Sequence, residues 1–315
     1  MGRGGWPGVR RELAVARVEI RQGRFQRTMA LLSAFSAIVS GFEAYTQHER
    51  GAFSHWLMWT PVWLTPPATL AGIAAVFSRR VARLVLPVVA LASLIDGLLG
   101  FIYHIRGVRG LPGGFRLGQY NLVIGPPLFA PVLTGMVGVL GLLASALRRE
   151  QLGWFEHRSP SLGQLQRLGR FDTRQASLPA LLAHGEFQRG MALLAAVFAA
   201  LAGGEAYLEH LRGSFNRRVM WTPVWVTPPM IAAGIAAALD RRAARLVLPF
   251  VSLAALADGA LGFVLHVQGL QRMPGGVRNL RFNLVLGPPL FAPLLFSAVG
   301  LLGLIATLLR RRDGA

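Results

Sequence analysis

The chain has 315 residues, of which 53% are hydrophobic and 15% are charged, and its 33 basic side chains against 14 acidic ones give a formal net charge of +19. Soluble domains carry about 25% charged residues, so this composition lacks the polar surface of a water-soluble globule. All basic residues are Arg and Cys is absent, which excludes lysine Schiff bases, P-loop lysines, disulfides, thiolate metal sites and cysteine nucleophiles.

The first predicted element is a short helix near the N-terminus. Residues 10–22 read RRELAVARVEIRQ, a mixture typical of a helix lying on an anionic membrane surface or of an ordinary solvated helix. Residues 1–27 contain no small-residue cleavage site after a short apolar run, so they are not read as a removable signal peptide. We assign 1–27 to a cytoplasmic or interfacial segment.

The rest of the chain contains one unit twice. MWTPVW begins at Met58 and again at Met220, and NLVIGPPLFAP from Asn121 returns as NLVLGPPLFAP from Asn283. Both pairs are 162 positions apart, and this register continues without a gap from Gly23 to Arg149, with more than half of the paired residues identical. The chain is therefore a tandem duplication.

Each copy contains four apolar segments long enough to cross a hydrocarbon core, which needs about 20 helical residues. They are predicted near 28–47, 56–78, 84–105 and 120–147, and near 190–209, 219–240, 246–267 and 282–309. We predict an all-α integral membrane protein with eight transmembrane helices. The repeats occupy 28–149 and 190–311, joined by a linker at 150–189. Because four is even, the two four-helix bundles are expected to be related in parallel, about an axis along the membrane normal.

The distribution of Arg predicts the orientation. Arg residues precede the first span, fill the loop between the second and third spans and follow the fourth span: Arg21, Arg24, Arg27, Arg79, Arg80, Arg83, Arg148 and Arg149. We expect both termini and the linker in the cytoplasm and the chain in the cell inner (plasma) membrane. The Arg residues flank apolar runs, so the net charge indicates a lipid bilayer as partner and not a nucleic acid.

Ionisable groups inside a membrane are costly and often mark functional sites. Four of them recur in both copies: Glu43, His48, Asp96 and His104, with Glu205, His210, Asp258 and His266. Counted from Arg27 and Arg83, both histidines of the first copy lie 21 residues into their spans. At about 1.5 Å per residue the imidazoles reach similar depths near the outer surface. The carboxylates lie one to two turns deeper.

Three functions fit these residues. The first function is the binding of a b-type haem. Its ligands would be His48 and His104 in the first copy and His210 and His266 in the second copy. Gly41, Gly97 and Gly100 would make room for the macrocycle, and Arg50 (Arg212 in the second copy) or Arg116 would meet its propionates. The second function is the binding of a non-haem divalent metal by carboxylates and one histidine. The carboxylate ligands would be Glu43 and Asp96 in the first copy and Glu205 and Asp258 in the second copy. In the third, the acids and histidines relay protons or contact a transported substrate. Alternatively, each polar group only fixes the packing of the helices.

Proline-rich stretches are the other signal. Proline is well placed at the first helical position, so regular helix is expected to begin afresh near Pro66-Pro67 and Pro126-Pro127. Interrupted spans at matching places in two halves point to a membrane binding site. Asn121 and Asn283 are expected to cap the fourth spans, and Trp59 and Trp221 to belong to an interfacial aromatic belt.

The sequence thus predicts a cofactor- or metal-binding bundle protein, a subunit of a membrane redox or electron-transfer assembly with other membrane subunits as partners. The alternatives are a proton-coupled or polar-substrate transporter with its site at the proline breaks, and a non-catalytic structural subunit. The sequence contains no nucleophile–base arrangement or nucleotide motif, so whether the chain is an enzyme stays open.

Overall fold

The computed structural model describes residues 24–146 and 186–308. The predicted helix at 10–22 and most of the predicted linker lie outside these ranges. The described residues form helices, turns and loops, and no strand occurs among them. Six helical stretches are long and apolar enough to cross a membrane: Phe25–Arg50, Trp56–Phe77, Leu86–Gly110, Gln188–Arg212, Arg218–Leu239 and Ala243–Gln271. An all-α membrane protein is therefore supported, with six candidate spans where the sequence predicts eight.

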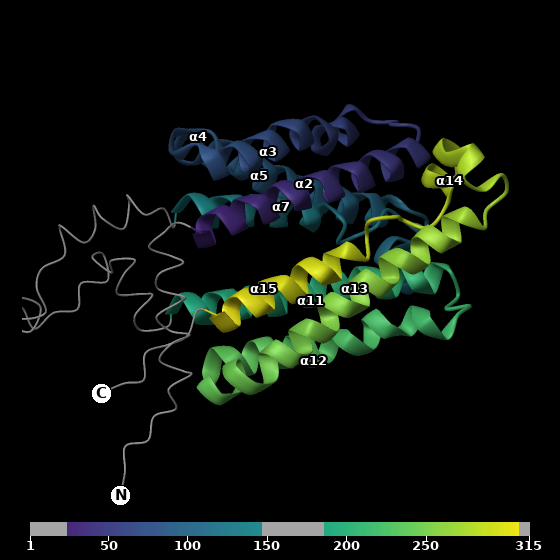
Figure 1. Ribbon diagram of the computed structural model, residues 1–315. Helices are drawn as coiled ribbons and strands as arrows, with labels where there is room; N and C mark the ends of the chain where they lie inside the picture. Colours follow the sequence, from purple (N-terminus) through teal and green to yellow (C-terminus); the bar gives the residue numbers. More distant parts are fainter. Residues whose placement is uncertain (1–23, 147–185, 309–315) are drawn as a thin grey trace, which may run out of the picture.

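The same elements occur in both halves (Figure 1). In the first half they are α2 (Arg24–Arg50), α3 (Thr60–Phe77), α4 (Arg79–Leu84), α5 (Leu86–Gly110), α6 (Gly118–Ile124) and α7 (Pro131–Ala146), with 3₁₀ turns at Trp56–Trp59 and Gly114–Leu117. In the second half they are α11 (Glu186–Arg212), α12 (Thr222–Leu239), α13 (Leu248–Gln271), α14 (Leu280–Leu286) and α15 (Leu294–Leu308). A π-helical turn at Ala243–Val247 precedes α13, and 3₁₀ turns lie at Arg218–Trp221 and Gly276–Asn279.

Small residues bring the helices of each half close together. A Cβ added to Gly97 on α5 would lie 2.4 Å from the backbone nitrogen of Gly135 on α7. Likewise, a Cβ on Gly72 of α3 would lie 2.8 Å from the Ala30 carbonyl oxygen on α2. Membrane helices associate through such close backbone approaches because lipid supplies no hydrophobic drive between them.

The outward surface is apolar. Leu70, Phe77, Leu84, Leu239 and Phe250 are each at least 63% exposed, although large apolar side chains are normally the first to be buried. The mean hydropathy of the chain is +0.47. Exposed apolar surface of this extent marks an interaction surface, and lipid is the partner expected for long apolar helices.

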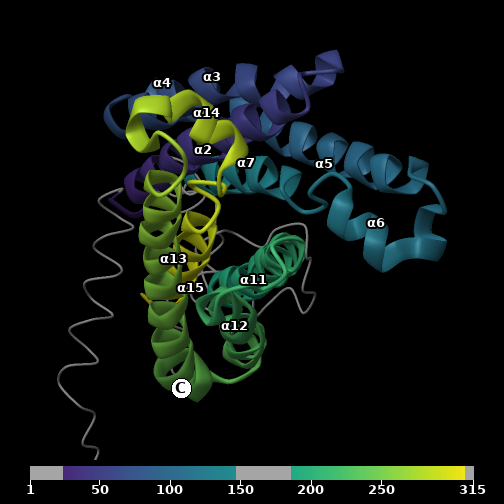
Figure 2. The ribbon, with the colours of Figure 1, turned by 90° about the vertical axis from the view of Figure 1, so that its right-hand side faces the viewer.

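The halves exchange their short helices. α14 belongs to the second half but contacts α2 of the first, as Figure 2 shows, and α6 of the first half contacts α11 of the second. Buried side chains from both halves, such as Leu140 and Phe198, belong to one continuous apolar core. The two repeats are therefore packed together as one structure.

The proline breaks differ from the prediction. α3 continues through Pro66 and Pro67 without restarting, as α12 does through Pro228 and Pro229. The Thr65 hydroxyl donates to the Pro61 carbonyl one turn earlier at 2.8 Å, while the two prolines remove the amides that would bond the Val62 and Trp63 carbonyls.

The fourth segment is broken, but not where the prediction placed the new helix. α6 ends at Ile124, residues 125–130 are not helical, and α7 begins at Pro131. Pro131 occupies the first helical position, where its missing N–H costs nothing. The second half repeats this break between α14 and α15, around Pro288-Pro289. An interruption of the fourth segment was therefore predicted, but the new helix begins at Pro131 and not at Pro126-Pro127.

Candidate functional site: a polar layer at the broken segments

The Glu43 carboxylate reaches from one half to the other. Its side chain is only 6% exposed. Oε1 accepts a hydrogen bond from the Gln47 amide at 3.2 Å, and Oε2 accepts one from the backbone N–H of Phe291 at 3.1 Å. Phe291 lies in the break just before α15. Glu43 therefore binds the free backbone of the broken segment of the opposite half.

Glu205 makes the equivalent contact in the opposite direction, but the residues around its carboxylate differ from those around Glu43. Its Oε2 accepts from the backbone N–H of Phe129 at 2.6 Å, across the same interface. Its Oε1 is buried and has no hydrogen-bond partner among the described residues. The position of Gln47 is occupied in this half by Glu209, which forms an ion pair with Arg212 at 3.0 Å. One carboxylate thus has both oxygens bonded, and the other keeps a buried oxygen free.

Arg50 and Arg212 cap the short helices of the opposite half. Arg50 donates to the carbonyl oxygens of Val285 and Gly287, at 2.8 and 2.9 Å. Arg212 donates to those of Val123 and Gly125, both at 2.6 Å. The last carbonyls of a helix lack partners within the helix and attract cations. Both guanidinium groups, predicted to meet propionates, are engaged by backbone.

The histidines bind backbone carbonyls through Nδ1. His48 contacts the Met58 carbonyl oxygen and His104 that of Pro127, both at 2.6 Å. His210 and His266 repeat this with Met220 and Pro289 at 2.6 and 2.5 Å. Because a carbonyl only accepts, Nδ1 carries the proton and a neutral ring leaves Nε2 as an acceptor.

The two imidazoles of the first half, which were predicted only to reach a similar depth, lie close together. The ring centroids of His48 and His104 are 6.5 Å apart. The Pro127 carbonyl that His104 binds lies in the break before α7. This histidine therefore stabilises the non-helical backbone of the fourth segment.

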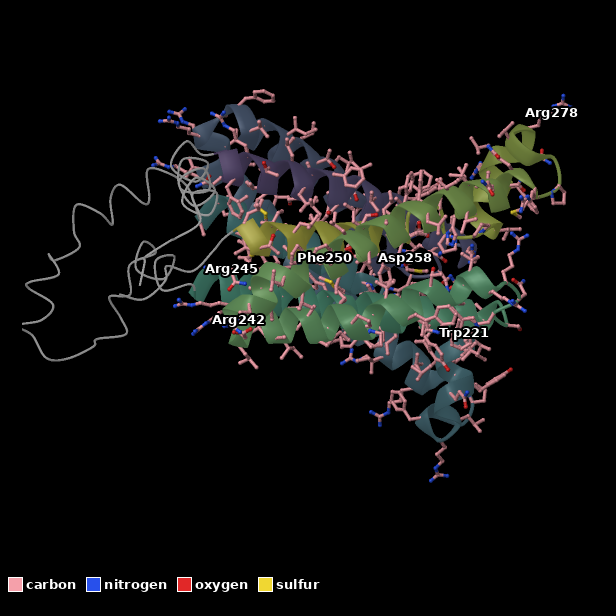
Figure 3. The ribbon with its side chains drawn as sticks, turned by 60° about the horizontal axis from the view of Figure 1, so that its bottom comes forward. Trp221, Arg242, Arg245, Phe250, Asp258 and Arg278 are labelled. Atoms are coloured by element: carbon pink, nitrogen blue, oxygen red, sulfur yellow. The ribbon has the colours of Figure 1, made fainter. Side chains whose placement is uncertain are left out.

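Asp96 and Asp258 do not join the glutamates. Asp96 lies within hydrogen-bonding reach of the Thr60 hydroxyl and Asp258 within reach of that of Thr222, each at the start of the neighbouring helix. Figure 3 shows Asp258 partway along the molecule, between Arg242 and Arg245 at one end and Arg278 at the other. These aspartates lie near side chains of their own half and do not face the opposite half as the glutamates do.

The predicted haem pocket is filled by protein. The glycine positions expected to leave room for a macrocycle meet other helices: Gly41 packs against the Thr65 side chain, Gly97 against the Gly135 backbone and Gly100 against the Pro131 ring. The residues do not fit a haem between these helices. Among the described residues, no three or more His, Cys, Asp or Glu side chains gather to hold a metal ion, so the predicted carboxylate–histidine ligand set is not assembled.

Asn121 and Asn283 are not helix caps, which corrects the prediction. Asn121 lies within α6 and is 1% exposed. Its amide donates to the Pro112 and Gly114 carbonyl oxygens at 3.0 and 2.7 Å, and Asn283 makes the equivalent two bonds. These side chains fasten the preceding turn, since an Asn inside a short helix can reach the backbone that leads into it.

Trp59 and Trp221 stabilise a strained turn. Ala52 and Phe53 have φ values of 54° and 45°, as Ser214 and Phe215 have 59° and 44°. A left-handed conformation is uncommon for bulky residues. The Phe53 ring stacks on Trp59 with ring centroids 3.9 Å apart, and Phe215 stacks on Trp221 in the second half with centroids 4.0 Å apart. Trp59 therefore packs against protein, and its place in an interfacial belt stays a prediction.

Sequence reasoning did not identify the backbone N–H groups of Phe129 and Phe291 or the pair Gln47 and Glu209. The first have no sequence signal beyond the GPPLFAP stretch itself. The second was visible as one of the few polar mismatches between the copies. No protein-family model, curated protein or solved structure matches this chain.

Proposed function

We propose that the chain crosses the membrane eight times, as two four-helix modules related in parallel. α7 has 16 residues, or about 24 Å of helix at 1.5 Å per residue, which falls short of a hydrocarbon core of about 30 Å. The break at 125–130 and α6 would supply the rest of the fourth crossing. Such a break is tolerated in a membrane where protein covers it, and Glu205, His104 and Arg212 bind its backbone.

In the same proposal both termini lie in the cytoplasm of the inner (plasma) membrane. The chain has no Cys, so single cysteines can be placed without background. A membrane-impermeant maleimide added to whole cells should label Arg278→Cys and leave Arg80→Cys unlabelled. The reverse pattern would contradict this orientation.

Within this architecture the geometry best supports transport of a proton or small polar solute. The observation that carries the proposal is the reciprocal pair of carboxylates, Glu43 and Glu205, each bound to the broken segment of the opposite half. Transporters commonly place their sites at interrupted helices between repeats. Intramembrane carboxylates are the groups that carry protons there.

The contacts suggest how binding would couple to movement. Protonation of Glu205 weakens its ability to accept from the Phe129 N–H, because the charged form makes the stronger hydrogen bond. Since that bond joins the halves, its loss favours their separation at this level. Beneath it lies an apolar gap of about 10 Å³ between the halves, lined by Phe129, Val132, Met136, Phe198, Leu201, Ala202 and Leu295. A gap of this size and polarity is too small and too apolar to hold water stably. A proton or solute that reached Glu205 would therefore find no continuous water through this gap.

A structural subunit of a membrane complex is the second candidate. This role is favoured because the polar side chains of the site donate hydrogen bonds to backbone carbonyls of the protein itself. They are the four histidines, Arg50, Arg212, Asn121 and Asn283. The redox assembly has less support from the geometry, since the described residues assemble no ligand set. Absorbance of the purified protein in the Soret region would restore it, and partner chains that co-purify with a flux-inactive protein would favour the structural subunit.

The test of transport uses purified protein in liposomes with a pH-sensitive dye inside. An imposed pH gradient should collapse faster than in empty liposomes, and Glu205→Gln should slow it to the empty-liposome rate. Asp240→Ser is the matched control, because it removes a carboxylate outside the membrane where the first half carries Ser78. Equal flux in wild type and Glu205→Gln, or none above empty liposomes, would refute proton transport.

A further inference from the structure

The contacts between the halves come in reciprocal pairs. Glu43 binds Phe291, and the residues 162 positions away, Glu205 and Phe129, bind each other in the same way. Arg50 caps the end of α14, and Arg212 caps the end of α6 at the equivalent carbonyls. An interface in which residue i of one unit meets residue j of the other, and j meets i, is isologous and self-complementary.

The residues that make these contacts are the same in both copies. Glu, Arg, Phe, Val and Gly stand at the paired positions 43/205, 50/212, 129/291, 123/285 and 125/287. The aromatic packing beside them tolerates both copies as well. Phe42 meets Phe291 edge-on with centroids 5.0 Å apart, and at the reciprocal position Gly204 admits the Phe129 ring. The hydrogen bonds therefore do not distinguish the first repeat from the second, although Phe42 against Gly204 is a difference in the packing beside them.

We propose that the surface by which each repeat binds the other is a docking surface for any second copy of the same repeat. The first repeat would then pair with another first repeat as it pairs with the second. The exchange of α6 and α14 between the halves, seen for α14 in Figure 2, is the geometry of a symmetric dimer in which each unit completes the other.

Two differences between the copies bias this surface toward unlike pairing. Glu49 forms an ion pair with Arg281 across the interface at 2.8 Å, whereas Leu211 and Gln119 stand at the reciprocal positions. A pair of two first repeats or of two second repeats would lack this ion pair on both sides.

The second difference is Gln47 in the first half against Glu209 in the second. Glu209 lies near enough to interact electrostatically with Glu43 and Arg50 of the opposite half. In a pair of two second repeats, each Glu209 would face Glu205 of the other repeat as it now faces Glu43, and this like-charge repulsion would occur on both sides, whereas two first repeats would carry Gln47 there. The order of stability expected is first–second, then first–first, then second–second.

The test uses full-length chains in which one repeat replaces the other. In the first–first chimera, residues 24–146 also occupy the place of 186–308. In the second–second chimera, 186–308 also occupy the place of 24–146. The control is the native order rebuilt with the same junctions. We expect the first–first chimera to purify as a monodisperse monomer with a lower Tm than the control, and the second–second chimera to be lower still. Placing Arg at the position of Gln119 in the second copy of the first–first chimera should restore the ion pair and raise its Tm.

A second measurement uses the native chain. Arg50→Ala and Arg212→Ala should both lower Tm, with the larger loss for Arg212→Ala because it also removes the ion pair with Glu209, and Arg116→Ala, at an exposed position, should leave Tm unchanged. The proposal is overturned if the first–first chimera aggregates while the rebuilt control does not. It is also overturned if only one of the two arginine substitutions lowers Tm, because a self-complementary interface uses both alike.

Discussion

The close approach of α5 and α7 allows one substitution to be worked out in detail. A Cβ at Gly97 would lie 2.4 Å from the Gly135 nitrogen, 2.7 Å from the Gly135 Cα and 2.8 Å from the Pro131 carbonyl oxygen. All three are backbone atoms, which cannot rotate out of the way as a side chain can. Gly97→Ala should therefore push the two helices apart.

The expected cost follows from overpacking, about 1–3 kcal/mol for atoms forced into a filled core. The unfolding temperature changes by roughly 2–4 °C per kcal/mol in chains of about 150–250 residues, so Tm should fall by several degrees. Unfolding in detergent, followed by intrinsic Trp fluorescence, measures this change directly.

The same contact provides the control. A Cβ at Gly135 would meet only Leu94 Cδ1, at 3.9 Å, and the second half carries Ser297 at this position, where its hydroxyl donates to the Leu256 carbonyl oxygen at 3.1 Å. Gly135→Ser should change the free energy of unfolding by only about 0.5 kcal/mol, the usual range for substitutions away from tight packing or strain. If Gly97→Ala proves as stable as wild type, or Gly135→Ser as damaging as Gly97→Ala, the reasoning from the contact is wrong.

Three further changes follow from the same approach. Asn121→Ala removes both hydrogen bonds from the side-chain amide to the turn at Pro112–Gly114 and should destabilise the protein by about 1–3 kcal/mol. Asn121→Asp should be similarly harmful, because a carboxylate cannot donate to these carbonyls. Denaturant unfolding measures both changes. Hydrogen bonds from the backbone N–H groups of Ala243 and its neighbours hold the pKa of Asp240 below its usual range. The contribution of Asp240 to stability should therefore persist above its unfolded-state pKa and disappear as the pH falls through its folded-state pKa. The Tm of Asp240→Ala and of wild type, compared across acidic pH, checks this, and a Tm difference that grows toward low pH would contradict it. Phe53→Ala removes the ring stacked on Trp59 and should increase proteolysis of the 51–55 turn, whereas Phe77→Ala, at an 84% exposed position, should not.

The sequence predicts the duplication and the first three helices of each half to within a few residues, because apolar length and Arg flanks are local signals. Helix α5, for example, spans 86–110 against a predicted 84–105. The fourth segment was misjudged because proline marks a possible helix start without saying which proline is used. Pro131 begins α7, while Pro66 and Pro67 stay within α3.

The sequence identified the polar residues of the candidate site but not the partners that their side chains contact. Counting residues places Glu43 and Asp96 in one layer, yet Glu43 contacts the opposite half and Asp96 lies near Thr60 of its own half. The direction a side chain faces depends on how the helices are rotated against their neighbours. That rotation is fixed here by contacts between residues as far apart in the chain as Glu43 and Phe291, which no local pattern contains.

The exchange of contacts has a consequence for the order in which the protein is made. Phe129 precedes Glu205 by 76 residues, and Glu43 precedes Phe291 by 248. At about 5–20 residues per second, the first break would wait roughly 4–15 s for its carboxylate, and Glu43 would wait roughly 12–50 s for its amide. The two breaks therefore differ during synthesis: Phe129 is made before the carboxylate that accepts from it, whereas Phe291 emerges when Glu43 is already in place.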